Sequence, residues 1–325
     1  MLKVAIIGEC MIEINGELFG QTTQSFGGDT LNTAVYLARA SEGLEVSYVT
    51  VLGTDVLSEG LLSRWQAEGV KTDLVLRDSE RQPGLYMIQL DEQGERSFVY
   101  WRSQSAARYL MQHPNFSAIE PKLNTMDMVY LSGISLAILS QQDRLRLLAV
   151  LARLHSKGVE IVFDSNFRAG LWLDLAEARE CYRQVYAMTS IALVTDEDEA
   201  KLWGDTEGND VRNIAKTIIS RLSAMGVGQV VIKQGENGAV YQNMVTDSAS
   251  TRIPTIPVPE VVDTTSAGDA FNAGFLAGYL MQKSIIDCVT QGHLLAGKVI
   301  QFKGAIIPRS VTTPVIKTFR NLPAL

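Results

Sequence analysis

The sequence predicts an α/β protein with a mostly parallel central sheet and helices on both faces. Two observations carry this prediction. Continuous β-branched runs alternate with helical patterns along most of the chain, and uninterrupted apolar runs are typical of parallel strands buried between helices. The chain also has 325 residues, which is enough to bury a large core. From length alone, one large α/β domain and two smaller ones both remain possible.

Composition narrows the class of protein. The net charge is −7, which disfavours nucleic acid or an anionic membrane as a partner. The three cysteines lie far apart and indicate neither a disulfide framework nor a Cys-rich metal site. No apolar run is long enough to cross a bilayer, and the start of the chain does not resemble a signal peptide. We expect a cytoplasmic protein that acts on small molecules.

The first part of the chain predicts strand, helix, strand and helix in turn. Residues 3–8 form a β-branched run that ends in glycine, which indicates a buried parallel strand. The helical pattern that continues to Ala40 follows two glycines, and Asp29 or Thr30 is its expected N-cap. Residues 46–52 predict the next strand and residues 58–68 the next helix.

A hairpin interrupts this alternation. Residues 84–90 and 96–102 are two strand-like runs, and residues 91–95 have the composition of a turn between them. The shorter β-leaning segment 11–26 could pair with this hairpin. Two arrangements remain open from these residues alone: a small separate sheet that acts as a lid, or a plain antiparallel edge of the main sheet.

The second half of the chain returns to alternating elements. Strands are expected at residues 128–133, 160–163, 191–194 and 229–234, with a helix at 141–157. Asp164, Asn166 and Arg168 follow one of these strands. Because ligands of doubly wound sheets collect at the carboxyl ends of strands, these three polar residues are candidates for a binding site.

The clearest indication of a catalytic site is the run Asp-Thr-Thr-Ser-Ala-Gly-Asp-Ala-Phe at residues 263–271. It precedes a predicted helix at 270–282 and places Ser266, Ala267 and Gly268 at the helix start. Small side chains let an anion approach the unpaired amides there, and the carboxylate of Asp269 could serve as a base beside it. An ordinary helix N-terminus, with Asp269 opposing the helix dipole, explains the same residues equally well.

The same run resembles the C-terminal signature of the ribokinase-like carbohydrate kinases of the PfkB type, in which a glycine is usual where this chain has Ser266. The resemblance implies that Asp269 is the catalytic base and that the amides of Ser266, Ala267 and Gly268 form the anion hole. It also implies a single ribokinase-like domain over residues 1–325, with a discontinuous β lid from about residues 11–26 and 83–102. ATP and Mg²⁺ would be the cofactors.

Other segments extend the resemblance over nearly the whole chain. The segment Gly-Gly-Asp-Thr-Leu-Asn-Thr-Ala at 27–34 is similar to the N-terminal signature of the family, which makes Gly28, Asp29 and Asn32 contacts to the sugar. A strand followed by Gly235 and Gly238 resembles the nucleotide-phosphate turn of the family, with Lys233 nearby. Glu199 matches the glutamate of an Asn-x-x-Glu element that organises Mg²⁺ through water, although Asp196 stands in the asparagine position.

Several short segments resemble the branch of the family that phosphorylates the sugar acid 2-keto-3-deoxygluconate. They include residues 7–13, 83–86, 100–102 and 130–140. In that branch Tyr86, Tyr100 and Arg102 would hold the acid, and Asn166 and Arg168 would lie between the acid and nucleotide sites. Some relatives place an aspartate in the late helix where this chain has Gln291, Gly292 and His293. The expected reaction is transfer of phosphate from ATP to the primary C6 hydroxyl of the acid.

Alternatives remain at this point. A ribokinase, a fructokinase or another keto-sugar-acid kinase would share the scaffold, and so would a nucleoside kinase, which the two arginines disfavour. A non-catalytic sugar-acid sensor would have no need of Asp269. Because relatives often pair through their lids, a homo-oligomer is expected.

One motif is rejected as a phosphate loop. Residues 292–298 spell Gly-x-x-x-x-Gly-Lys, but they lack the following Ser or Thr and lie within a helical pattern. We expect them to belong to a helix, at about residues 284–302, that helps to wall the nucleotide site.

Overall fold

The computed structural model describes the chain except for residues 18, 42, 91–95, 206–210, 248 and 320–325. Its main feature is a sheet with the strand order β13-β12-β11-β10-β9-β8-β1-β4-β5. Only β12 and β13 run antiparallel to their neighbours in this sheet, so the predicted mostly parallel sheet is confirmed. The strands are β1 (Leu2–Ile7), β4 (Leu44–Gly53), β5 (Val75–Asp78), β8 (Met128–Ser132), β9 (Glu160–Asp164), β10 (Ile191–Thr195), β11 (Gln229–Lys233), β12 (Ala239–Asn243) and β13 (Thr251–Ile253).

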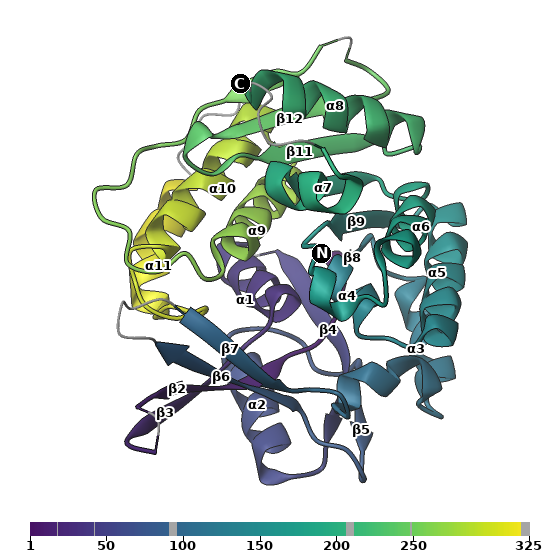
Figure 1. Ribbon diagram of the computed structural model, residues 1–325, viewed down its shortest axis with the longest axis vertical. Helices are drawn as coiled ribbons and strands as arrows, with labels where there is room; N and C mark the ends of the chain where they lie inside the picture. The colour runs from purple at the N-terminus through teal and green to yellow at the C-terminus, as the bar shows by residue number, and fades with distance from the viewer. Residues whose placement is uncertain (18, 42, 91–95, 206–210, 248, 320–325) are drawn as a thin grey trace.

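Helices cover both faces of this sheet, as the sequence predicts (Figure 1). Successive side chains of a strand point to opposite faces, so Val4 and Ile6 join one core while Ala5 and Ile7 join the other. The first core includes α1 (Asp29–Ala40), α2 (Val56–Ala67), α9 (Ala267–Leu280), α10 (Ile285–Val299) and α11 (Arg309–Phe319). The second includes α3 (Phe116–Leu123), α4 (Gly133–Ala137), α5 (Gln141–Ser156), α6 (Leu175–Tyr186), α7 (Asp196–Trp203), α8 (Val211–Ala224) and the 3₁₀ turn η1 (Ala106–Gln112).

Helix α9 is buried along most of its length between α1 and α10. Gly274 permits the close approach of α10, because a Cβ atom at this position would lie 2.6 Å from the carbonyl oxygen of Gln291. The packing fixes the position of α9 on the sheet, and with it the position of its first turn. Of the helices described here, none combines the length and the apolar character that a bilayer span requires.

A second, smaller sheet stands apart from the main one (Figure 1). Its order is β3-β2-β6-β7, from β2 (Met11–Gly16), β3 (Thr22–Gly27), β6 (Gly84–Leu90) and β7 (Arg96–Trp101). Strands β6 and β7 pair antiparallel, as expected for a hairpin, while the predicted turn at 91–95 lies outside the described residues. The two open arrangements are thereby decided in favour of a separate sheet.

The predicted elements differ from the observed ones mainly at their ends. The expectation that Asp29 or Thr30 caps α1 was wrong: Gly28 is the N-cap, and both residues lie in the first turn. Helix α9 begins at Ala267, three residues before the predicted start, because Ser266 already adopts the cap position. The segment 292–298 lies within α10, as expected for a helical segment rather than a phosphate loop.

Candidate active site

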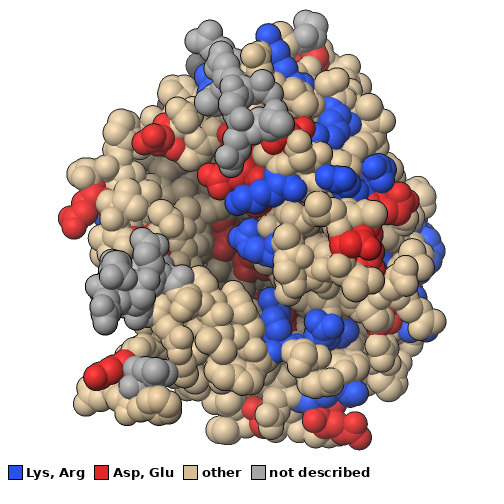
Figure 2. Space-filling model, viewed as in Figure 1, with Lys and Arg blue, Asp and Glu red and all other residues tan. Residues whose placement is uncertain are grey.

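The predicted site residues gather at the carboxyl ends of the main strands, where the first turns of α1 and α9 meet. Asn32 of α1 and Asp269 of α9 are 237 residues apart, yet the Asn32 Nδ2 donates a hydrogen bond of 2.8 Å to the Asp269 Oδ2. Figure 2 shows a hollow on this face of the molecule, with acidic side chains on its floor and basic side chains along one rim. The two signatures of the sequence therefore build one site.

Asp269 is the acid at the centre of this arrangement. It is 9% exposed, and burial raises the pKa of its carboxyl to about 7, helped by the negative charges of Asp29 and Asp164 and opposed by the hydrogen bond from Asn32. A carboxyl that titrates near neutral pH can take up a proton more readily than an ordinary aspartate. The environment of Asp269 is therefore suited to a general base.

The turn before Asp269 carries a backbone feature that the sequence did not predict. Ser266 has φ 65°, in the left-handed region that few residues with a Cβ adopt. From here the chain enters α9, whose first turn contains Ala267, Gly268 and Asp269. The left-handed residue explains physically why a glycine suits this position.

Changing Ser266 to Gly should stabilise the fold. The left-handed conformation costs a residue with a Cβ about 1–2 kcal/mol, and the greater freedom of glycine in the unfolded chain cancels part of this gain. We expect the free energy of unfolding to rise by about 0.5–1 kcal/mol, measured by denaturant titration. Ala267→Gly is the matched control, and it should destabilise because Ala267 is already helical. Equal effects of the two changes would contradict the strain at Ser266.

A cavity of about 740 Å³ opens beside this turn. The residues predicted for nucleotide binding that line it are Lys233, Gly235, Gly238, Ala267 and Gly268. Its opposite part is mainly apolar, with walls from Ile256, Pro257, Val258, Val261, Phe271, His293, Ala296, Gly297 and Ile300. His293, Ala296 and Gly297 come from one face of α10, and Ile300 follows the helix directly. The cavity therefore combines an apolar slot with a polar end.

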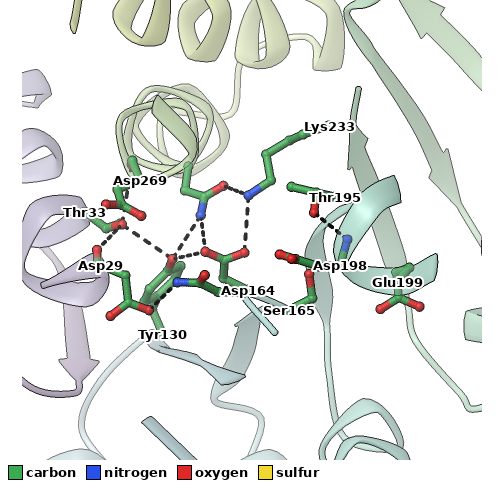
Figure 3. A network of polar contacts seen from close by, with 12 residues as sticks. Asp29, Thr33, Tyr130, Asp164, Ser165, Thr195, Asp198, Glu199, Lys233 and Asp269 are labelled. Atoms are coloured by element: carbon green, nitrogen blue, oxygen red, sulfur yellow. Dashed lines mark hydrogen bonds and ion pairs between the residues drawn. The ribbon is translucent and has the colours of Figure 1, made fainter. Parts of the chain in front are cut away.

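A network of polar side chains connects Lys233, on the wall of the cavity, with α9, the helix that carries Asp269 (Figure 3). The Lys233 Nζ lies 3.2 Å from the Asp164 Oδ1 and 3.0 Å from the Asn272 Oδ1. The Asn272 Nδ2 donates to the Asp164 Oδ2 at 2.9 Å and to the Tyr130 hydroxyl at 3.0 Å. Lys233 is thus held by two side chains, and the cavity lies beside it.

The residues predicted to contact the sugar lie on the side of Asp269 that is away from Lys233 and the cavity. Gly28 is required by a close approach, because a Cβ atom there would lie 2.2 Å from the carbonyl oxygen of Glu9. The Asn166 Nδ2 donates to the Asp29 Oδ2 at 2.7 Å, and Asn166 itself has φ 27°. Burial raises the pKa of Asp29, and the charge of Asp164 adds to this effect. Gly28, Asp29, Asn32 and Asn166 thus lie around the base.

The small sheet, with the residue that follows β7, carries the aromatic and basic residues predicted for the acid group. Arg102 forms an ion pair with Glu9, which also accepts a hydrogen bond from the Ser105 hydroxyl. The Arg102 guanidinium lies 5.9 Å from the ring centre of Tyr100, and the ring centres of Tyr100 and Tyr86 are 5.9 Å apart. The structure brings these three predicted residues together near the end of β7.

Arg168 and Glu199 are placed differently from the other predicted residues. Arg168 is about half exposed and lies 3.5 Å from Asp198. Glu199 is fully buried, and its carboxylate accepts a hydrogen bond from Tyr186 and faces Arg221 at 3.6 Å. In Figure 3 Asp198 lies on the side of Asp164, and Glu199 lies on the far side of α7. The role of Glu199 near a metal stays a prediction. Asp196, which stands in the asparagine position, lines the cavity described above together with Glu197, while Asp198 faces Arg168.

The comparison with protein families decides the family. Residues 1–312 match the model described as pfkB family carbohydrate kinase. The chain belongs to this family. A 2-dehydro-3-deoxygluconokinase of Haemophilus influenzae is 52% identical over 311 residues, covering 95% of this chain and 96% of that relative.

Solved structures of pfkB-type kinases share the fold. A 2-dehydro-3-deoxygluconokinase from Thermotoga maritima has a TM-score of 0.82 and 22% identity, covering 98% of this chain and all of that one. A putative Ribokinase II from E. coli, in complex with ATP and Mg²⁺, has a TM-score of 0.80 and 22% identity, covering 99% of both chains. The fold is therefore ribokinase-like, as the sequence resemblance implies.

Several residues of this pfkB-type site were missed by sequence reasoning. Glu9 follows β1 directly, so the rule that polar residues collect at strand ends could have identified it. Asn272 lies one turn after Asp269 in a helix that is otherwise mostly apolar, and a lone buried amide is a signal of a specific role. Asp198 is one of four consecutive acids, and the resemblance pointed to Glu199 and Asp196 instead of it.

Proposed function

We propose that this protein is an ATP-dependent sugar-acid kinase that phosphorylates the C6 hydroxyl of 2-keto-3-deoxy-D-gluconate, also called 2-dehydro-3-deoxygluconate. The products are the 6-phosphate and ADP. The observation that carries the reaction type is the position of Asp269. It is a buried carboxyl with a pKa of about 7, and it lies between the residues predicted to contact the sugar and the cavity that begins at Gly268. The substrate is supported by the relative that is 52% identical over nearly the full chain.

The mechanism follows from the position of the base. Asp269 accepts the proton of the C6 hydroxyl, and the hydroxyl oxygen forms a bond to the γ-phosphorus of ATP. The bond between that phosphorus and the β–γ bridging oxygen breaks, and its electron pair leaves with ADP. The amides at Ser266, Ala267 and Gly268 stabilise the charge on the transferred group. The lid would exclude water, so that ATP is not hydrolysed instead.

The donor groups of the site fit Mg²⁺ delivered with ATP. Among the described residues, no three His, Cys, Asp or Glu side chains gather into a metal site. Mg²⁺ commonly keeps its waters and uses one or two carboxylates together with phosphate oxygens, so a cage of side chains is not required. We propose that Asp198, which lies nearer to Asp164 than Glu199 does, is a carboxylate partner of the ion, and that Glu199 acts indirectly through water. When bound, Mg²⁺ would reduce the negative charge of the phosphates during transfer.

Recognition of the acid group is assigned to the lid. Arg102 can hold a carboxylate through a charge-assisted hydrogen bond, and its Nε is a buried donor without a partner in the part of the chain described here. Tyr86 and Tyr100 lie beside it and supply apolar ring faces. Tyr100 also supplies a hydroxyl group, while the Tyr86 hydroxyl donates to Glu13. We further propose that Arg168, which is exposed at the rim, approaches the bound molecules from the nucleotide side.

The pH dependence of the reaction should report the base. Because only ionised Asp269 can accept a proton, and its pKa is raised to about 7, kcat/KM should increase with pH below about 7 and level off above it. Initial rates between pH 5.5 and 8.5, at saturating Mg²⁺, would measure this profile. In Asp269→Asn the same limb should be absent. A wild-type profile that stays flat across neutral pH would contradict the assignment.

A substrate panel tests the proposed function. We expect phosphorylated product from 2-keto-3-deoxygluconate and much lower kcat/KM values with gluconate, ribose and fructose, measured by coupled detection of ADP. A preference for ribose or fructose would place the chain in another branch of the family. Binding of the sugar acid without release of ADP would instead support a sensor.

We also propose that the protein forms homo-oligomers in the cytoplasm. The edge strand β7 exposes Phe98, Val99, Tyr100 and Trp101 by 38–55%, an apolar strip that a second copy could cover. Cys10, Cys181 and Cys288 are free and buried, as suits a reducing compartment. Sedimentation velocity would measure the oligomeric state.

A further inference from the structure

Helix α9 carries a second buried polar side chain one turn after the base. Asn272 is 0% exposed and lies three residues from Asp269, so the two side chains lie on the same side of the helix. A buried amide lowers stability unless its hydrogen bonds are made. The contacts of Asn272 therefore indicate what it is retained for.

The Asn272 amide satisfies three different groups at once. Its oxygen accepts from the Lys233 Nζ, and its nitrogen donates to the Asp164 carboxylate and the Tyr130 hydroxyl. These partners come from β11, β9 and β8, so one side chain of α9 joins three strands of the main sheet. Neither a carboxylate nor an apolar side chain of the same shape could replace both the acceptor and the donors.

Lys233 is the partner that faces the reaction. Its ammonium group has three N–H donors, of which Asp164 and Asn272 engage two. The remaining donor is on the wall of the cavity, and an ideal Cβ atom on Gly268 would lie only 3.6 Å from the Nζ. A positive charge is therefore fixed beside the amides at the start of α9.

We propose that Asn272 is a positioning residue for phosphoryl transfer, which holds the Lys233 ammonium at the amide turn where negative charge gathers on the transferred group. This inference rests on the proposed function. An ammonium held in place before the reaction stabilises developing charge more effectively than a mobile one, because it needs no rearrangement. Asp164 supplies the opposite charge that keeps Lys233 in a buried place, and Asn272 directs it.

A double-mutant cycle with Asn272→Leu and Lys233→Met tests the proposal. We expect Asn272→Leu to lower kcat by about ten-fold and to leave the KM for the sugar acid near its wild-type value. In the Lys233→Met background the same change should have little further effect, because its path runs through Lys233. If the fold-losses of kcat in the two single variants multiplied in the double variant, the two residues would act independently and the proposal would be overturned.

Two further variants separate positioning from stability. Thr189→Val removes another buried hydrogen bond, to the Val185 carbonyl outside the site, and should lower stability without lowering kcat. Asn272→Asp keeps the shape and the acceptor for Lys233 but places a second carboxylate 2.9 Å from Asp164. It should also lower kcat, since the added charge opposes that of Lys233. Normal kcat in both Asn272 variants would overturn the proposal.

A binding measurement distinguishes this inference from the proposed function. Calorimetry on the four proteins of the cycle would compare a non-hydrolysable ATP analogue with ADP. Asn272→Leu and Lys233→Met should each weaken binding of the analogue by about ten-fold more than binding of ADP. In the double variant the two losses of affinity should not multiply. That pattern in a protein without turnover would support the inference and overturn the kinase assignment. Equal weakening of both ligands would place Lys233 away from the terminal phosphate and overturn the inference.

Discussion

Changing Asp269 to Asn should lower kcat by about 10²–10⁴-fold, the usual contribution of a positioned base. An amide cannot accept the proton of the sugar hydroxyl, so the attacking oxygen would have to lose it to water. The change conserves volume, and the new amide oxygen can still accept the hydrogen bond from Asn32. Initial rates with saturating ATP and 2-keto-3-deoxygluconate would measure the loss.

The same variant should be more stable than the wild type, which separates the loss of kcat from unfolding. The folded-state pKa of Asp269 is raised from 3.8 to about 7, so the folded protein binds a proton more tightly than the unfolded chain. The contribution of this group to stability is therefore present at low pH and is lost as pH rises through about 7. At pH 8 Asp269→Asn should raise the free energy of unfolding by about 1–3 kcal/mol.

Asp287→Asn is the matched control for this experiment. Asp287 lies in the first turn of α10 and is about as buried as Asp269, but it accepts hydrogen bonds from Ser284 and takes no part in the site. Its kcat should equal that of the wild type. Undiminished turnover in Asp269→Asn would remove Asp269 from the role of base.

The main elements of the fold could be predicted because each strand or helix has its own hydrophobic pattern in the local sequence. The run Met128–Ser132 is buried on both faces, and so its sequence is apolar without alternation. The order of strands is not a local property: β1 lies between β8 and β4, far from β2, which follows it in sequence. The small sheet required the same kind of long-range pairing, and the residues alone left two arrangements open.

The site could be predicted where a short motif contains the chemistry. Asp269 and its small-residue turn lie within one run, and Gly28 and Asn32 lie within another. The contacts of Asn272 could not be predicted in this way, because Asp164 is 108 residues distant and Tyr130 is 142. Glu9 and Arg102 are likewise 93 residues apart. Strand order, rather than any pattern near these residues, brings them together.

Changing Arg102 to Ala should raise the KM for the sugar acid by about 10–100-fold, because a hydrogen bond between charged groups contributes about 1.5–3 kcal/mol. The KM for ATP should stay near its wild-type value, since the predicted nucleotide residues line a cavity to which Arg102 does not contribute. Steady-state kinetics with each substrate varied in turn would measure both constants. Equal effects on the two constants would count against recognition of the acid by Arg102.

Glu9 complicates this variant and also provides its control. Without Arg102 the buried Glu9 carboxylate retains only Ser105 among the partners described above, and an unpaired buried charge destabilises by about 3–5 kcal/mol. The double variant Glu9→Gln, Arg102→Ala removes this charge and should recover stability while the KM for the acid stays high. Arg81→Ala, which removes an arginine paired with Asp78 next to the lid, should leave the KM unchanged. If the KM returned to normal in the double variant, the defect would belong to the uncompensated Glu9, and the acid would have to be held by other groups.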